Sequence, residues 1–74
     1  MIANINYLEE LMRKNNYNYT SLSKEISLNP STLSAKIKGG SDLKFSEAVD
    51  ISNVLKMDKQ EFLICFFELN LHEV

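Results

Sequence analysis

Two short amphipathic segments joined by a tight turn constrain this chain more than any other feature. The first segment covers about residues 18–26 and the second about residues 29–38. Asn18 and Asn29 open them, and asparagine is a favoured helix N-cap, while the proline after Asn29 suits the first helical position. The pair Gly39-Gly40 ends the second segment, because glycine tolerates the left-handed conformation past a helix end. The sequence therefore predicts two helices that meet at a sharp turn.

The apolar positions of these segments indicate a common core. They repeat at one-turn spacing, with one position in the turn itself: Leu22, Ile26, Leu28, Leu33 and Ile37. A tight turn makes the two helices cross at a steep angle, so these side chains must converge. Ser23 is small and permits a close approach of the helices. By spacing alone, an ordinary helical corner in any small domain remains an alternative.

The outward face of the 29–38 segment is unusual for a surface helix. Its side chains are small or hydroxylated apart from one lysine: Ser31, Thr32, Ser34, Ala35 and Lys38. No carboxylate occurs between Asn29 and Gly40. Small side chains let a helix enter a groove, where hydroxyl groups can bind base edges or phosphates and an alanine methyl can contact a thymine methyl. Lys36 and Lys38 are expected to neutralise phosphates where the helix leaves the groove.

Three further helices are predicted around this pair, over about residues 4–15, over about 46–55 and from Asp58 onward. Asp58 and Glu61 form a reciprocal cap pattern at the start of the last of them. After Phe67 the chain alternates apolar and polar residues, so that a strand, a fraying helix end and coil all remain open. With 74 residues, the chain is expected to form a single all-α domain, residues 1–74, with a core over about residues 4–67 and a tail over 68–74.

Composition removes several classes of function. One cysteine and one histidine provide neither an internal disulfide nor a structural zinc site, so no metal or other cofactor is expected. No apolar run approaches the ~20 residues of a membrane span, and no signal peptide is visible. The single cysteine points to a reducing, cytoplasmic setting. A chain this short rarely builds an enzyme pocket, and the adjacent Glu9 and Glu10 do not face each other on a helix. We therefore expect a binding module rather than an enzyme, with Cys65 buried and inert.

The charge is distributed unevenly along the chain. The net charge is −2, yet six of the eight basic residues lie within residues 13–44, together with only two acidic residues. Six of the ten acidic residues lie within residues 45–74. A basic middle beside an acidic last third indicates an anionic partner better than the total charge does.

These features together resemble a known family. Residues 18–39 resemble the helix-turn-helix of phage Cro and repressor proteins, and residues 31–39 match a subgroup that reads S-T-L-S-x-K-h-x-G, where h is apolar. The resemblance extends over about residues 4–67. It includes residues 45–48 with Ile51 and Leu55 as a fourth helix, and Met57-Asp58 with Phe62 as the start of a fifth. It implies a compact five-helix fold of the lambda-repressor type.

The resemblance also implies a way of binding double-stranded operator DNA. The 29–38 segment is expected to enter the major groove, and the start of the 18–26 segment to lie over the sugar-phosphate backbone. Tyr19 stands where the family usually has a glutamine, and its hydroxyl is expected to reach a phosphate. The residues expected to contact DNA are Tyr19, Thr20, Asn29, Ser31, Thr32, Ser34, Ala35, Lys36, Lys38, Ser41 and Lys44.

The sequence departs from the family pattern at two positions in the turn region. Ser23 stands where the family usually has alanine, and Ser27 where it usually has glycine. Ser27 is therefore expected to adopt a backbone conformation that costs glycine nothing. The base-facing positions hold no arginine, glutamine or asparagine, which predicts modest sequence selectivity or readout through DNA shape.

The run from Phe62 to Phe67 is apolar nearly all round a helix. One interpretation is that Phe62, Phe66 and Phe67 close the core. The other is a self-complementary dimer patch, formed by helix pairing or strand addition, that consists of Leu63, Phe66, Phe67, Leu69 and Leu71. A two-fold dimer would place two DNA-reading helices about one helical turn of DNA apart.

Taken together, the sequence predicts a DNA-binding transcription regulator of the Cro/repressor class. We expect phage or prophage origin, a homodimer, and neither cofactor nor catalysis. The alternative is a protein of the same fold that binds a partner repressor instead of DNA. Salt dependence separates them, because DNA binding weakens steeply with salt whereas an apolar protein contact does not.

Overall fold

The computed structural model describes residues 2–39 and 42–67, which form five α-helices and no strand. The helices are α1 (Ile5–Lys14), α2 (Tyr19–Glu25), α3 (Pro30–Lys38), α4 (Phe45–Val54) and α5 (Lys59–Phe67). The predicted all-α fold and the order of its helices are confirmed over these residues. The three conformations left open for the tail, residues 68–74, fall outside the described part of the chain.

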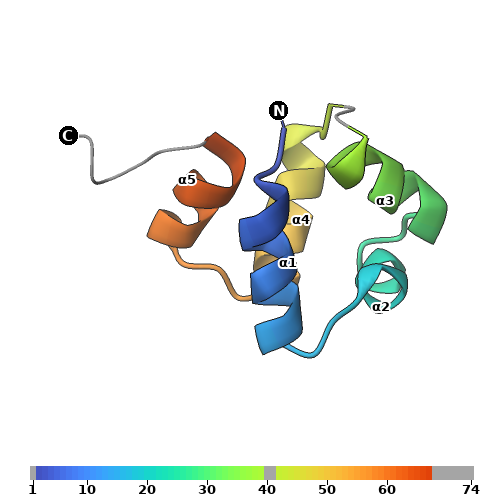
Figure 1. Cartoon of the computed structure of the whole chain (residues 1–74), viewed down its shortest axis with the longest axis horizontal. Coiled ribbons are helices and arrows are strands. Elements are labelled where there is room, and N and C mark those ends of the chain that lie inside the picture. Colours follow the sequence, from blue (N-terminus) through green and yellow to red (C-terminus); the bar gives the residue numbers. More distant parts are fainter. Residues whose placement is uncertain (1, 40–41, 68–74) are drawn as a thin grey trace.

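The helices lie in three groups along the molecule. The α2–α3 pair lies at one end and α5 at the other, with α1 and α4 between them (Figure 1). α2 packs on both α3 and α4, and α1 packs on α5. The backbone N–H of Asn4 donates to the carbonyl oxygen of Cys65 at 2.7 Å, which joins the start of α1 to α5. The exposed face of the α2–α3 pair is therefore well separated from α5.

Local capping signals decide where the helices begin. Asn18 accepts from the backbone N–H of Ser21 at 2.8 Å, and the Ser21 hydroxyl accepts from the N–H of Asn18 at 3.0 Å. Asp58 and Glu61 make the same reciprocal pair before α5, at 2.7 and 3.0 Å. Such bonds satisfy N–H groups that the first turn of a helix leaves without partners. These caps appear as the sequence predicts because each depends on residues three apart.

Three helices end in a left-handed residue that is not glycine. The φ angle is 63° at Asn16 after α1, 59° at Ser27 after α2 and 55° at Lys56 after α4. At the first of them, the N–H of Tyr17 donates to the carbonyl of Met12 at 2.8 Å, and equivalent bonds of 2.9 Å follow α2 and α4. This pattern is the Schellman motif, which needs a left-handed residue at its centre. The left-handed conformation predicted for Ser27 is confirmed.

Gly39 ends α3 for a reason that differs from the prediction. Its φ is −86°, which is right-handed, so the expected left-handed conformation does not occur at this residue. A Cβ atom there would lie 2.6 Å from the carbonyl oxygen of Ala35. Glycine is therefore needed at this position for close approach to the preceding turn. Gly40 lies outside the described residues.

The core draws on every helix. Its buried apolar side chains are Ala3, Leu8, Leu11, Met12, Leu22, Leu33, Ile37, Leu43, Ala48, Ile51, Leu55, Cys65 and Phe66. Of the five residues predicted to converge at the turn, Leu22, Leu33 and Ile37 are fully buried, and the other two pack against this core half-buried. Ser23 is also buried, and its hydroxyl donates to the carbonyl of Thr20 at 2.7 Å. The small polar side chain thus fits the helix crossing without an unsatisfied group.

The side chains that α5 buries match neither interpretation of its sequence in full. Cys65 and Phe66 are buried, whereas Phe67 is 50% exposed and does not close the core. Phe66 is therefore a core residue, and its burial does not support its predicted place in a dimer surface. Leu63 is half-buried, and Leu69 and Leu71 lie outside the described residues.

Candidate nucleic-acid interface

α3 presents the predicted small side chains to its surroundings. Ser31, Thr32, Ala35 and Lys38 are exposed, and Ser34 is half-buried at the edge of this face. Leu33 and Ile37, on the opposite side of the helix, are completely buried. Because these two large side chains fix α3 in the core, its outer surface is held rigidly. Among its exposed side chains only that of Lys38 carries a charge.

The hydroxyl group of Ser31, in the first turn of α3, is held in place by Asn29. The side-chain oxygen of Asn29 accepts from the backbone N–H of Ser31 at 2.9 Å and from the Ser31 hydroxyl at 2.6 Å. Because that oxygen is only an acceptor, the hydroxyl must donate its proton to it. The Ser31 oxygen then offers only lone pairs to an external partner. Asn29 is exposed but contributes mainly by capping the helix.

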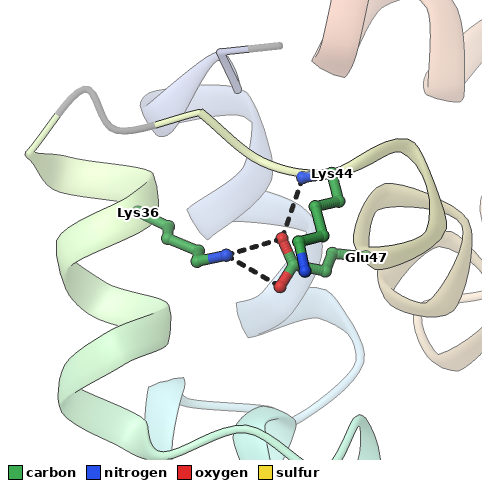
Figure 2. Close-up of polar contacts among 3 residues, drawn as sticks. All are labelled: Lys36, Lys44 and Glu47. Atoms are coloured by element: carbon green, nitrogen blue, oxygen red, sulfur yellow. Dashed lines mark hydrogen bonds and ion pairs between the residues drawn. The ribbon is translucent and has the colours of Figure 1, made fainter.

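Lys36 does not lie where the sequence suggested. Its ammonium group bonds both carboxylate oxygens of Glu47 in α4, at 2.8 and 2.9 Å (Figure 2). The two side chains are only 20% and 14% exposed. The backbone N–H of Lys44 donates to the same carboxylate at 2.8 Å. Lys36 therefore fixes α3 against α4, and this pairing does not support the expectation that Lys36 neutralises a phosphate.

The Glu47 carboxylate stays ionised in this setting. Burial alone would raise its pKa, but the hydrogen bonds from Lys36 and from the Lys44 backbone, with the charges of both lysines, hold the pKa below its ordinary value. A charge-assisted pair of this kind is stronger than a neutral hydrogen bond. It joins the end of α3 to the start of α4.

Tyr19 also differs from its predicted role. Its hydroxyl donates to Glu9 in α1 at 2.8 Å, so its proton is already bound within the protein. Burial, followed by the hydrogen bond and charge of Glu9, raises the pKa of Tyr19 well above its ordinary value, which keeps the phenol protonated. The expectation that this hydroxyl reaches a phosphate is therefore not supported by the geometry.

The ring of Tyr19 has a second partner on α3. The ammonium group of Lys38 lies 4.9 Å from the ring centroid, within the range of a cation–π contact. Sequence reasoning missed both partners of Tyr19 and the Lys36–Glu47 pair. Each joins side chains on different helices, and their spacing in the sequence carries no signal of the contact.

The remaining predicted DNA contacts lie outside α3 in the sequence. Thr20 is exposed at the start of α2, and Lys44 is exposed just before α4. Ser41 lies outside the described residues. The backbone over residues 18–39 thus forms two helices at a sharp turn, the second capped, anchored and free of carboxylates on its outer face.

One family model matches this chain, and it describes the Cro/C1-type HTH DNA-binding domain over residues 7–68. The chain belongs to this Cro/C1-type helix-turn-helix family. The match runs from α1 to the end of α5 and so covers the whole described fold. Neither the curated proteins nor the solved structures gave a significant match. In this Cro/C1-type domain, α2 and α3 are the helix-turn-helix, and DNA is the ligand class of the family.

Burial raises the pKa of the Cys65 thiol to about 12, so this cysteine is neutral and enclosed, as predicted. Over residues 2–39 and 42–67, no three potential metal ligands cluster. No helix within these ranges is long and apolar enough to cross a membrane.

Proposed function

We propose that this Cro/C1-type domain is a transcription regulator that binds operator DNA selectively, with α3 in the major groove. The observation that carries the proposal is the outer face of α3, where four exposed side chains include two hydroxyls, one methyl and one lysine, and no carboxylate. This face occurs in a chain whose net charge is −2. An acidic surface helix would be repelled by DNA, whereas this helix fits a groove lined by phosphates.

The proposal divides the α3 surface into two roles. Ser31, Thr32 and Ala35 face base edges, with Ser34 beside them, because they are exposed in the first two turns. Because the Ser31 hydroxyl proton is donated to Asn29, its outward lone pairs suit the amino group of adenine or cytosine. The methyl group of Ala35 suits the methyl group of thymine.

Contacts to the sugar-phosphate backbone come from the rim of this surface. Lys38 and Lys44 supply positive charge at the end of α3 and before α4. Thr20 and Ser41 supply hydroxyl groups, and the cap of Asn29 holds the N-terminus of α3 in place. Such contacts position the protein, whereas the base edges supply selectivity.

We further propose that the domain acts as a homodimer. Leu63 and Phe67 lie on α5, at the end of the molecule opposite the helix-turn-helix (Figure 1). Two-fold pairing at α5 leaves both α3 helices free to contact two half-sites about one helical turn of DNA apart. The resemblance to phage Cro and repressor proteins supports a phage or prophage origin.

Selection from a random duplex library, at near-physiological salt, tests this proposal. An inverted repeat with half-sites about one helical turn apart supports both the DNA-binding role and the dimer. A preference for adenine or cytosine at one position of the site supports the role of Ser31 if the same selection with Ser31→Ala loses that preference. A single short site retains the DNA-binding role but refutes the dimer. Recovery of no sequence by a folded protein refutes the proposal.

One observation favours a second candidate, the binding of a partner repressor protein. Phe45 and Phe67 are 61% and 50% exposed, and both rings contact Phe62, with centroids 6.2 and 6.0 Å away. Exposed aromatic side chains are typical of protein-binding surfaces. A partner contact on these rings would weaken little with salt, unlike DNA binding.

A further inference from the structure

We propose that Tyr19 is a positioning residue whose ring holds the ammonium group of Lys38 at the DNA-facing end of α3. This inference rests on the proposed function and assigns its backbone contact to Lys38 rather than to the tyrosine hydroxyl. Tyr19 begins α2 and Lys38 ends α3, so the contact links the two helices of the motif at the rim of the proposed interface.

The hydroxyl of Tyr19 is poorly suited to bind phosphate itself. It donates its only proton to Glu9 at 2.8 Å. A phosphate accepting from the same hydroxyl would lie next to the Glu9 carboxylate, and like charges at that separation repel. Glu9 is half-buried and held by this bond, so it does not move aside without losing the contact.

The ring of Tyr19 is suited to hold a cation. The Lys38 ammonium lies 4.9 Å from its centroid, and no carboxylate within the described ranges pairs with that ammonium. A lysine side chain has many rotamers, and restricting them beforehand lowers the entropy cost of binding. A π-face attracts the ammonium without neutralising it, so the full charge remains available to a phosphate.

The placement of Lys38 is important for DNA binding because Lys36, the other lysine of α3, is paired with Glu47. Lys36 is bound to both oxygens of Glu47 and is largely buried. Lys38 is therefore the lysine of α3 with an exposed ammonium, and its placement decides whether the end of the helix meets the DNA backbone.

A double-mutant cycle on a duplex recovered by the selection tests the proposal. Affinity is measured by fluorescence anisotropy from 50 to 200 mM KCl for Tyr19→Phe, Tyr19→Leu, Lys38→Ala and the Tyr19→Leu/Lys38→Ala pair. Tyr19→Phe keeps the ring and is expected to bind like the wild type. Tyr19→Leu is expected to bind about 2- to 5-fold more weakly, the range of an exposed cation–π contact. Lys38→Ala is expected to make the salt slope shallower by about 0.9 per bound protomer, or about 1.8 for a dimer.

The double variant is expected to bind like Lys38→Ala alone, because Tyr19 acts through Lys38. If Tyr19→Leu costs as much in the Lys38→Ala background as in the wild type, the proposal is overturned. It is also overturned if Tyr19→Phe weakens binding as much as Tyr19→Leu, because the hydroxyl would then be the contact. Circular-dichroism melts show that each variant is folded at the assay temperature.

A measurement without DNA separates this inference from the proposed function. In NMR spectra, protons on the Cε of Lys38 are expected to shift upfield in the ring current of Tyr19, to keep the shift in Tyr19→Phe and to lose it in Tyr19→Leu. Absence of the shift in the wild type overturns the Tyr19 contact whatever the DNA result. A wild-type protein that shows the shift but binds no duplex overturns the proposed function, and with it the role of Lys38.

Discussion

At the scale of single residues, three helix ends depend on left-handed residues that are not glycine. Asn16, Ser27 and Lys56 all have φ near 60°. Asparagine reaches this region readily, but serine and lysine do so at a cost of roughly 1–2 kcal/mol, because Cβ approaches the following carbonyl. The glycine expected by family resemblance at position 27 therefore has a physical basis, and the structure keeps the same backbone with serine.

We predict that Lys56→Gly stabilises the domain by about 0.5–1 kcal/mol. The substitution removes the left-handed strain, which exceeds the extra entropy that glycine has in the unfolded chain. The matched control is Lys24→Gly, an exposed lysine inside α2, which should lose roughly 1 kcal/mol. Urea unfolding at pH 7 measures both. A Lys56→Gly variant less stable than the wild type would show that the αL residue carries no strain.

At the scale of helices, short-range signals were predicted and contacts between helices were not. Asn18, Asn29 and Asp58 were read correctly as caps because each bonds a residue two or three positions away. The orientation of α5 was missed because the helix is apolar nearly all round, so its sequence has no polar face to mark the outside. The Lys36–Glu47 pair depends on how α3 crosses α4, which spacing in the sequence does not encode.

We predict a pH-dependent contribution of that pair to stability. The folded state holds the pKa of Glu47 below its unfolded value, so the contribution is fully present above the unfolded pKa. It is lost as the pH falls through the folded pKa. Glu47→Gln should therefore destabilise the domain by about 1–3 kcal/mol at pH 7, and by much less at pH 3.

Urea unfolding of the wild type and Glu47→Gln at both pH values gives this difference directly. Asp50→Asn, an exposed carboxylate on the same helix, is the control and should change the free energy of unfolding by less than about 0.5 kcal/mol. An equal effect of Glu47→Gln at pH 7 and pH 3 would mean that the ion pair does not contribute through its charge.

At the scale of the whole molecule, few positive charges lie at the proposed DNA interface. Lys36 is neutralised by Glu47, which leaves Lys38 and Lys44 as the lysines proposed to meet phosphates. The last third of the chain is acidic and lies mainly in α4 and α5. In the proposed interface, contact with phosphate therefore depends on the placement of two lysines per protomer.

This charge count predicts a shallow salt dependence. Two phosphate contacts per protomer give a slope of about −1.8 for log affinity against log salt, or about −3.6 for a dimer. Filter binding from 50 to 200 mM KCl measures it. Lys38→Gln should make the slope shallower, whereas Lys36→Gln, although less stable, should leave it unchanged. A reduced slope for Lys36→Gln would show that this lysine leaves Glu47 when DNA binds.

The central claim is that the outer face of α3 binds DNA, and one charge on that face tests it most directly. Ser31→Glu places a carboxylate at the second helical position, where it suits the helix dipole and should leave folding intact. Gln60→Glu adds the same charge to the exposed start of α5, at the other end of the molecule (Figure 1). On a selected duplex, we predict that Ser31→Glu binds roughly 100-fold more weakly or not at all, while Gln60→Glu binds like the wild type. Wild-type affinity in a folded Ser31→Glu variant would contradict the account.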